Sequence, residues 1–192
     1  GASFTESLLQ SNNRVPEYTI RLNSLRTTRE KLREDLEKEG FEAAYGRYCE
    51  EALVIGNPSS TEKMEAFKRG LFRVQDESSM LVGRVLDPRP GDFVIDVCSA
   101  PGGKATHIAQ LMGNRGSVLA RDIHPHKIRL IEAAAERLGA DIIKAELFDA
   151  RETDPELRHK ADRVLVDAPC TGLGIIRRKP DIKWARSIRD TG

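Results

Sequence analysis

Residues 93–166 alternate short apolar segments with helical segments, and this alternation restricts the fold more than any other feature of the chain. Strands alternating with helices of about 10 to 15 residues predict βαβ units and a parallel sheet. The expected strands are Phe93–Val97, Ser117–Ala120, Asp141–Ala145 and Arg163–Val166. The expected helices run from Gly102-Gly103 to about Met112 and from His126 to Leu138. The sequence therefore predicts an α/β fold in this half.

The first 70 residues have a different pattern. Residues 17–25 alternate with period two, as a half-buried strand does, and a helix capped by Thr27 or Thr28 and ended by Gly40 follows. Short strands are expected at residues 41–45 and 53–55, and a second helix at 62–68. We expect a small α+β domain at residues 1–70. The α/β domain is expected at 71–192, beginning with a strand at 71–74 and a helix at 77–86.

Composition excludes several classes of protein. Charged residues make up 32% of the chain and apolar residues 39%. The sequence contains no run of about 18 apolar residues, so no membrane-spanning helix is predicted. The start has no secretory signal pattern. The three cysteines are far apart and none has metal-ligand spacing, so we expect no metal site and a reducing, cytoplasmic location.

A basic segment lies near the end of the chain. Residues 177–186 hold five cations, one acid and the only tryptophan, although the net charge of the chain is only +1. Such runs are commonly solvated loops. Lysine and arginine also supply most non-specific affinity for nucleic-acid phosphates. The candidate phosphate contacts are Arg177, Arg178, Lys179 and Lys183.

The turn after the first strand of the α/β half is a candidate ligand loop. Glycines allow the backbone to approach a ligand closely, and a helix start offers free N–H groups. The pattern lacks the GxGxxG spacing of dinucleotide sites, and a plain tight turn is the alternative. The candidate residues are Cys98, Ser99, Ala100, Pro101, Gly102, Gly103 and Lys104.

Carboxylates follow three later strands of this half. Asp122 comes 20 residues after Gly102, where an acid can bind ribose hydroxyls. Asp149 and Asp167 follow the next two strands, although Asp149 could equally be a cap or turn former. Because parallel strands end at one edge, these acids predict an adenosine-type ligand without a pyrophosphate, and S-adenosylmethionine fits that description.

The strand ending at Asp167 leads through Ala168 and Pro169 to Cys170. Ligands of open α/β sheets bind beyond the carboxyl ends of the strands, so this thiol could be chemical. Most free cysteines behave instead as small buried hydrophobic residues. From the segment alone, both interpretations stay open.

Three motifs together resemble the RsmB/Sun group of ribosomal RNA cytosine-5 methyltransferases. The motifs occupy residues 98–104, 167–172 and 176–184, and the resemblance covers about residues 17–190. It implies a Rossmann-like S-adenosylmethionine-dependent methyltransferase sheet, truncated here, preceded by a ferredoxin- or RRM-like RNA-binding domain. It also implies that the substrate is a cytosine of 16S ribosomal RNA, methylated at C5.

The resemblance also implies roles for the candidate residues. Residues 98–104 would surround S-adenosylmethionine, Asp122 would bind its ribose and Asp149 would lie near its adenine. Asp167 would lie near the methionine end and the target base. The expected catalytic residues are Asp167, Lys104 and Cys170, and Cys170 would assist product release rather than act as the nucleophile.

The nucleophile of this group is a cysteine in a Thr-Cys motif, and the 192 residues contain no such pair. We therefore expect a fragment of the catalytic domain that binds the cofactor weakly or not at all, has no turnover and exposes the strand at 163–166 as an edge. Two alternatives are a transfer RNA cytosine-5 methyltransferase and a non-catalytic RNA-binding module. A nicotinamide dehydrogenase is disfavoured by the missing GxGxxG pattern.

Overall fold

The computed structural model describes residues 1–185, and their contacts divide into two units. One unit, Tyr18–Ala168, contains two sheets and holds most of the candidate residues. The other combines Gly1–Glu17 with the segment that begins at Pro169, and it holds Cys170 and the basic segment.

The first sheet is antiparallel and has the strand order β2-β3-β1-β4. Its central strand β1 (Tyr18–Leu22) pairs with β3 (Ala52–Ile55) and β4 (Phe72–Val74), and β2 (Ala43–Tyr45) pairs with β3. Because β4 belongs to this sheet, the domain boundary expected at residue 70 falls before the sheet is complete.

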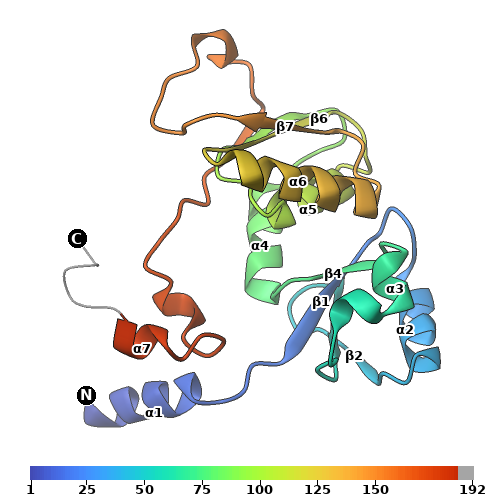
Figure 1. Cartoon of the computed structure of the whole chain (residues 1–192), viewed down its shortest axis with the longest axis vertical. Coiled ribbons are helices and arrows are strands. Elements are labelled where there is room, and N and C mark those ends of the chain that lie inside the picture. The colour runs from blue at the N-terminus through green and yellow to red at the C-terminus, as the bar shows by residue number, and fades with distance from the viewer. Residues whose placement is uncertain (186–192) are drawn as a thin grey trace. The chain divides into compact units, whose positions relative to one another are not determined.

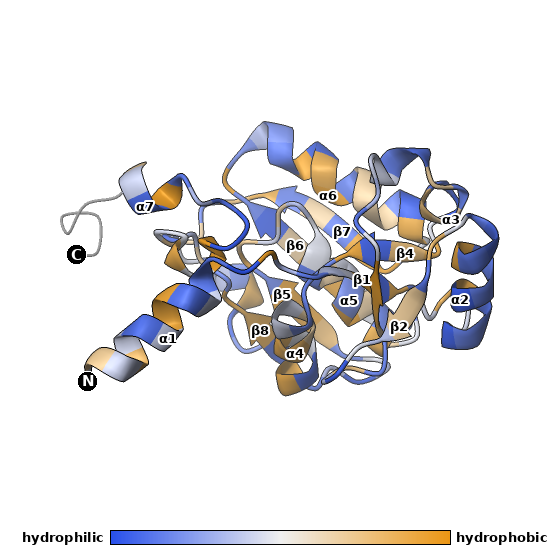
Figure 2. Cartoon of the chain, turned by 90° about the horizontal axis from the view of Figure 1, so that it is seen from below, coloured by the Kyte–Doolittle hydropathy of each residue, from blue (hydrophilic) through white to orange (hydrophobic). Residues whose placement is uncertain are grey.

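Helix α2 (Arg29–Lys38) covers this sheet with an apolar stripe, while most of its surface is hydrophilic (Figure 2). Its cap is the Thr28 hydroxyl, which accepts the Lys31 N–H at 3.3 Å, and Leu32 and Leu36 are fully buried. The second expected helix, at 62–68, is divided into a 3₁₀ turn (Thr61–Lys63) and α3 (Glu65–Lys68). Met64 between them has extended backbone and buries its side chain in the core.

The second sheet is parallel, as the alternation predicted, with the order β7-β6-β5-β8. Its strands are β5 (Phe93–Asp96), β6 (Ser117–Asp122), β7 (Ile143–Leu147) and β8 (Arg163–Leu165). Strand β8 lies at one edge, as expected. Because the strands are parallel, the carboxyl ends of all four lie at the same end of the sheet, here called the carboxyl edge.

Three helices pack on one face of the parallel sheet. Helix α4 (Glu77–Leu86) has the expected bounds, and α5 (Gly103–Leu111) and α6 (Pro125–Leu138) lie side by side against the strands (Figure 1). The buried residues of this layer are Val94, Ala105, Ile108, Met112, Val118, Ala120, Ile131 and Leu165.

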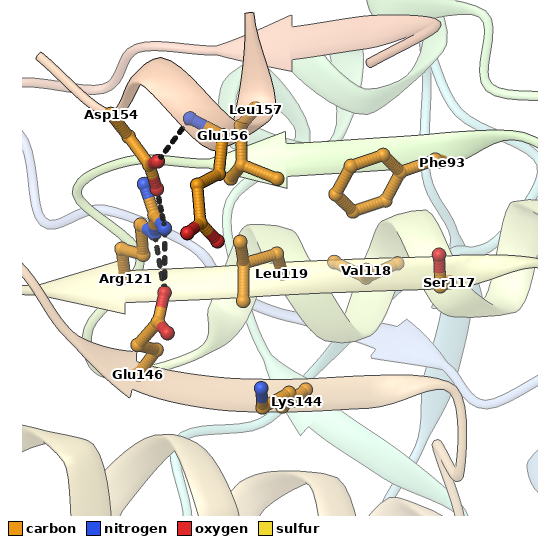
Figure 3. Close-up of a pocket in the computed structure, with 10 residues that line it drawn as sticks. All are labelled: Phe93, Ser117, Val118, Leu119, Arg121, Lys144, Glu146, Asp154, Glu156 and Leu157. Carbon is orange, nitrogen blue, oxygen red and sulfur yellow. Dashed lines mark hydrogen bonds and ion pairs between the residues drawn. The ribbon is translucent and has the colours of Figure 1, made fainter. Parts of the chain in front are cut away.

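The opposite face of the sheet carries no α-helix among the described residues, only the 3₁₀ turn Pro155–Leu157. A cavity of about 350 Å³ lies there, between strand residues and the segment around Leu157 (Figure 3). The Arg121 guanidinium donates to Glu146 at 2.7 Å and to Asp154 at 2.5 Å beside it. None of the candidate site residues lines this cavity, so it is not the predicted cofactor site.

The small domain touches the parallel-sheet domain closely at Gly70. The Asn23 amide donates to Gly70 O at 2.7 Å and to Leu138 O at 2.8 Å, and thereby joins the small domain to the end of α6. Gly70 has φ +67°, and a Cβ added there would lie 2.0 Å from the backbone oxygen of Arg137. Only glycine at this position allows the two backbone segments to approach this closely.

The other unit contains α1 (Ala2–Asn12), the 3₁₀ turn Leu173–Ile175 and α7 (Ile182–Ala185). No helix or strand was expected at residues 2–12, and no residue of α1 is buried. No described helix has both the length and the apolar character that crossing a membrane requires.

Candidate cofactor and catalytic site

The loop between β5 and α5 is shaped by glycine. Gly102 has φ +82° and precedes the first residue of α5, and its N–H donates to Ser99 O at 2.7 Å. A Cβ on Gly102 would lie 3.3 Å from Ile131 Cα and 3.4 Å from Ala134 Cβ. The loop can therefore lie against α6 only with glycine here, and its close approach brings the amides of α5 to the carboxyl edge of the sheet.

Lys104 and Asp167 meet at this edge. The Lys104 ammonium donates a hydrogen bond to the Asp167 carboxylate. Asp167 follows β8, and Lys104 lies in the first turn of α5. The Lys104 side chain is largely buried and that of Asp167 is half exposed. The structure thus brings together two of the three expected catalytic residues, as an ion pair open to solvent on one side.

Asp122 ends β6 and is buried. Its carboxylate accepts the His124 N–H at 3.1 Å, and the Lys127 ammonium lies 3.7 Å away. One oxygen makes both contacts, so the other is available to a ligand. This is the arrangement that an acceptor for sugar hydroxyls requires.

Asp96, at the end of β5, is a site residue that the sequence analysis did not assign. It is fully buried, and its carboxylate lies beside the Cys98 N–H and the Ser99 hydroxyl without a hydrogen bond of normal geometry to any residue of 1–185. The neighbouring Ser99 hydroxyl also lacks one. Burial raises the pKa of Asp96 to about 6. The signal was its position at a strand end, directly before the glycine loop.

We expect Asp96→Asn to stabilise the unliganded protein by about 3 kcal/mol above pH 6. The pKa of Asp96 is raised from 3.8 to about 6 in the folded chain, so the folded state gains stability as the pH falls through that window. The asparagine variant lacks this titration, and its advantage should vanish near pH 4. Urea unfolding from pH 4 to 8 measures the difference, with the exposed Asp162→Asn as control. A pH-independent difference would contradict the prediction.

The three cysteines have different surroundings. Cys49 is buried with Ala52 and Met80. Cys98, in the loop, is partly buried, and the pKa of its thiol is raised by burial and by Asp122 and other nearby carboxylates. Cys170 is exposed. The thiolate is the reactive form, so the site suppresses rather than promotes nucleophilic attack by Cys98.

Asp149, after β7, has its carboxylate engaged. The Arg151 side chain donates to both of its oxygens, and the Arg151 N–H donates to Oδ1 at 3.0 Å. The hydrogen bonds from Arg151 lower the pKa of Asp149 to about 2. The hydrogen bond from the Arg151 N–H to the Asp149 carboxylate is the contact expected of a turn former, which was the alternative role for Asp149. A role near adenine stays a prediction.

The basic residues lie in the other unit, with exposed side chains. Arg177 donates to Arg14 O at 3.3 Å, Arg178 to Glu17 O at 3.2 Å and Lys183 to the Asn13 side chain at 2.5 Å. Lys179 and Trp184 are also exposed, and Arg186 falls outside the described residues. Contact with RNA stays a prediction.

Within residues 1–185, no group of three or more His, Cys, Asp or Glu side chains is placed to hold a metal ion. The candidate site therefore consists of a glycine loop, a helix start, a lysine and strand-end carboxylates.

Comparisons with known proteins identify relatives of both parts of the chain. The family described as 16S rRNA methyltransferase RsmB/F matches residues 83–191, and its ferredoxin-like domain matches residues 1–62. A probable ribosomal RNA small subunit methyltransferase B from Bacillus subtilis is 46% identical over 179 residues, covering 92% of this chain and 39% of the relative. A tRNA (cytosine(72)-C(5))-methyltransferase from Pyrococcus horikoshii is 43% identical over 152 residues, covering 79% of this chain and 38% of the relative.

The fold is shared as well. The crystal structure of NSun6 from Pyrococcus horikoshii with SFG superposes with a TM-score of 0.84 at 27% identity, covering 94% of this chain and 70% of that one. The chain spans about two fifths of the length of the curated relatives described above. Both of its domains are matched, in the same order. The chain therefore belongs to the RsmB/RsmF family of 16S ribosomal RNA methyltransferases.

Proposed function

We propose that these residues are the cofactor-binding part of a longer cytoplasmic enzyme that transfers a methyl group from S-adenosylmethionine to C5 of a cytosine in 16S ribosomal RNA. The observation that carries this proposal is the set of carboxylates at the carboxyl edge of the parallel sheet. These carboxylates lie at the carboxyl ends of three adjacent strands. Asp96 is the last residue of β5, Asp122 is the last residue of β6, and Asp167 follows β8. Membership of the family supports the same reaction.

The residues present fit S-adenosylmethionine. Asp122 has a free carboxylate oxygen for ribose hydroxyls, and the buried, unpartnered carboxylate of Asp96 fits a group that donates hydrogen bonds. The unpaired amides in the first turn of α5 fit a carboxylate. When bound, the cofactor supplies an electrophilic methyl group on a sulfonium.

Cytosine C5 is a poor nucleophile, so the reaction needs a thiolate that adds to C6 and a base that later removes the C5 proton. We assign Asp167 to the N3 side of the target base, with Lys104 holding its carboxylate. The attacking thiolate would come from a Thr-Cys motif, which is not among these 192 residues. The raised pKa of Cys98 argues against that thiol as a substitute. The base must be unpaired to react, as single-stranded RNA targets are.

The test is methyl transfer by the whole enzyme to unmodified 16S ribosomal RNA, with mapping of the methylated nucleotide. We expect a single C5-methylated cytosine. We also expect Cys170→Ala to accumulate a covalent protein–RNA adduct, because Cys170 is proposed to assist product release. Cys49→Ala, which changes a cysteine buried against Ala52 and Met80, should form no adduct. Methylation of RNA without an adduct in the Cys170 variant would contradict its proposed role.

A transfer RNA cytosine is the second candidate substrate. It is favoured by the relative from Pyrococcus horikoshii that is named as a tRNA (cytosine(72)-C(5))-methyltransferase. The same assay separates the two, because transfer RNA would be labelled in place of 16S ribosomal RNA. Loss of RNA binding in Arg177→Ala with Arg178→Ala, without any cofactor dependence, would instead indicate a non-catalytic binding module.

A further inference from the structure

Two arginines face each other on adjacent strands of the small domain. Arg21 of β1 and Arg73 of β4 are directly opposite in the antiparallel pair. Arg21 is fully buried, and burial together with Arg73 lowers its pKa to about 9; burial also lowers the pKa of Arg73. Like charges directly opposite one another destabilise a sheet, and buried charges are costly. The pair therefore needs a compensating contact.

The compensating contacts include the Gln75 side chain, which accepts from Arg21, and two carbonyl groups of the cofactor loop. The Arg73 guanidinium donates to Pro101 O at 2.9 Å, and the Arg21 guanidinium donates to Gly103 O at 2.8 Å. These two carbonyl groups flank Gly102. Arg21 also donates to the Thr106 hydroxyl at 3.1 Å and to the Gln110 side chain at 3.0 Å, both on α5. The described hydrogen bonds of both guanidiniums go to neutral oxygen atoms, so the small domain holds the loop without an ion pair.

Holding the carbonyls also orients the amides. A peptide unit is planar and trans, so its C=O and N–H point in opposite directions. Fixing Gly103 O therefore fixes the Lys104 N–H, which is in the first turn of α5 and has no acceptor within the helix. On its other side the loop packs against α6, where a Cβ on Gly102 would be 3.3 Å from Ile131 Cα. The loop is thus held from both sides.

We propose that Arg21 and Arg73 are positioning residues for the cofactor, which they affect through the backbone of residues 101–103. The small domain then has a role in cofactor binding that is separate from any contact with RNA. This inference rests on the proposed function, in that it takes the loop to be the S-adenosylmethionine site.

Hydrogen exchange of the 192-residue chain without cofactor tests the inference directly. We expect Arg73→Met to speed exchange of the amides in residues 99–106 about tenfold, which is the effect of losing one hydrogen bond from a charged donor. Arg73→Lys keeps a donor for Pro101 O and should restore part of the protection. Arg73 is the residue to change, because the loss of the fully buried Arg21 could prevent folding.

The matched control is Arg137→Met. Arg137 also bridges the two domains, but it donates to Phe67 O at 2.8 Å and Phe72 O at 3.1 Å rather than to the loop. We expect it to leave exchange at 99–106 unchanged. Unchanged loop exchange in Arg73→Met, or equal acceleration in Arg137→Met, would overturn the proposal.

Calorimetric titration of the whole enzyme with S-adenosylmethionine gives the second measurement. The dissociation constant should rise about tenfold in Arg73→Met and should not change in Arg137→Met. Faster loop exchange in Arg73→Met, combined with no cofactor binding by the wild-type enzyme, would support the role of the arginines in holding the loop. The same combination would reject the cofactor assignment, so the two failures are distinguishable.

Discussion

Gly70→Ala is expected to destabilise the chain by at least about 3 kcal/mol, which is a large part of the stability of a typical domain. The added Cβ would lie 2.0 Å from Arg137 O and 3.0 Å from Arg137 C, both of which are backbone atoms at the end of α6. Neither can rotate away as a side chain could. Relief requires the two domains to separate, which would break the hydrogen bond from Asn23 to Leu138 O.

The control is Gly40→Ala, because Gly40 has a similar left-handed backbone with φ +85° and no atom within 4 Å of an added Cβ. It should cost only the backbone strain, about 1 to 2 kcal/mol. Urea unfolding of both variants separates the steric contact from the strain. Equal destabilisation of the two variants would show that the approach at Gly70 is not tight in solution.

Asp122→Ala in the whole enzyme is expected to weaken S-adenosylmethionine binding about a hundredfold. A carboxylate hydrogen bond contributes about 1.5 to 3 kcal/mol, and 2.7 kcal/mol corresponds to about a hundredfold change in affinity. Asp122→Asn keeps one acceptor oxygen and should lose about tenfold. Calorimetric titration measures both values.

Asp162→Ala is the matched control for this prediction. Asp162 belongs to the same sheet but precedes β8, and its carboxylate accepts the Phe93 N–H at 2.8 Å, as that of Asp122 accepts the His124 N–H. Both variants therefore lose a backbone contact, but only Asp122 lies at the carboxyl edge. An Asp122→Ala enzyme that binds the cofactor as tightly as Asp162→Ala would refute the ribose assignment.

The parallel sheet was predictable because its signals are local. Apolar strands, helical spacing and glycine breaks placed each strand and helix of residues 93–166 within a few residues of its observed bounds. The membership of β4 was not predictable, because its pairing with β1 joins residues about fifty positions apart and depends on the tertiary fold. Helix α1 was missed because its apolar residues stay exposed, so no buried stripe marks it.

The site was predictable only where sequence position determines geometry. Strand-end acids and the glycine loop share an edge in any parallel sheet, so Asp122, Asp167 and Lys104 could be expected at the same edge. Asp96 could not be distinguished, because its missing partners are visible only in three dimensions. Arg21 occupies a polar position in a strand that alternates between polar and apolar residues, so its side chain would be expected to face water. The second domain covers that face and buries it completely.

The position of β8 determines the order in which the site can assemble during folding. Strands β5, β6 and β7 are consecutive, each joined to the next by one helix, so they pair over short loops. By contrast, β8 pairs with β5, where Val94 lies opposite Arg163, and the segment between these two strands contains β6, β7 and their helices. Closing a longer loop costs more entropy and slows folding. The ion pair of Lys104 with Asp167, which follows β8, is therefore expected to form after β5, β6 and β7 have paired and the carboxylate of Asp122 is in place.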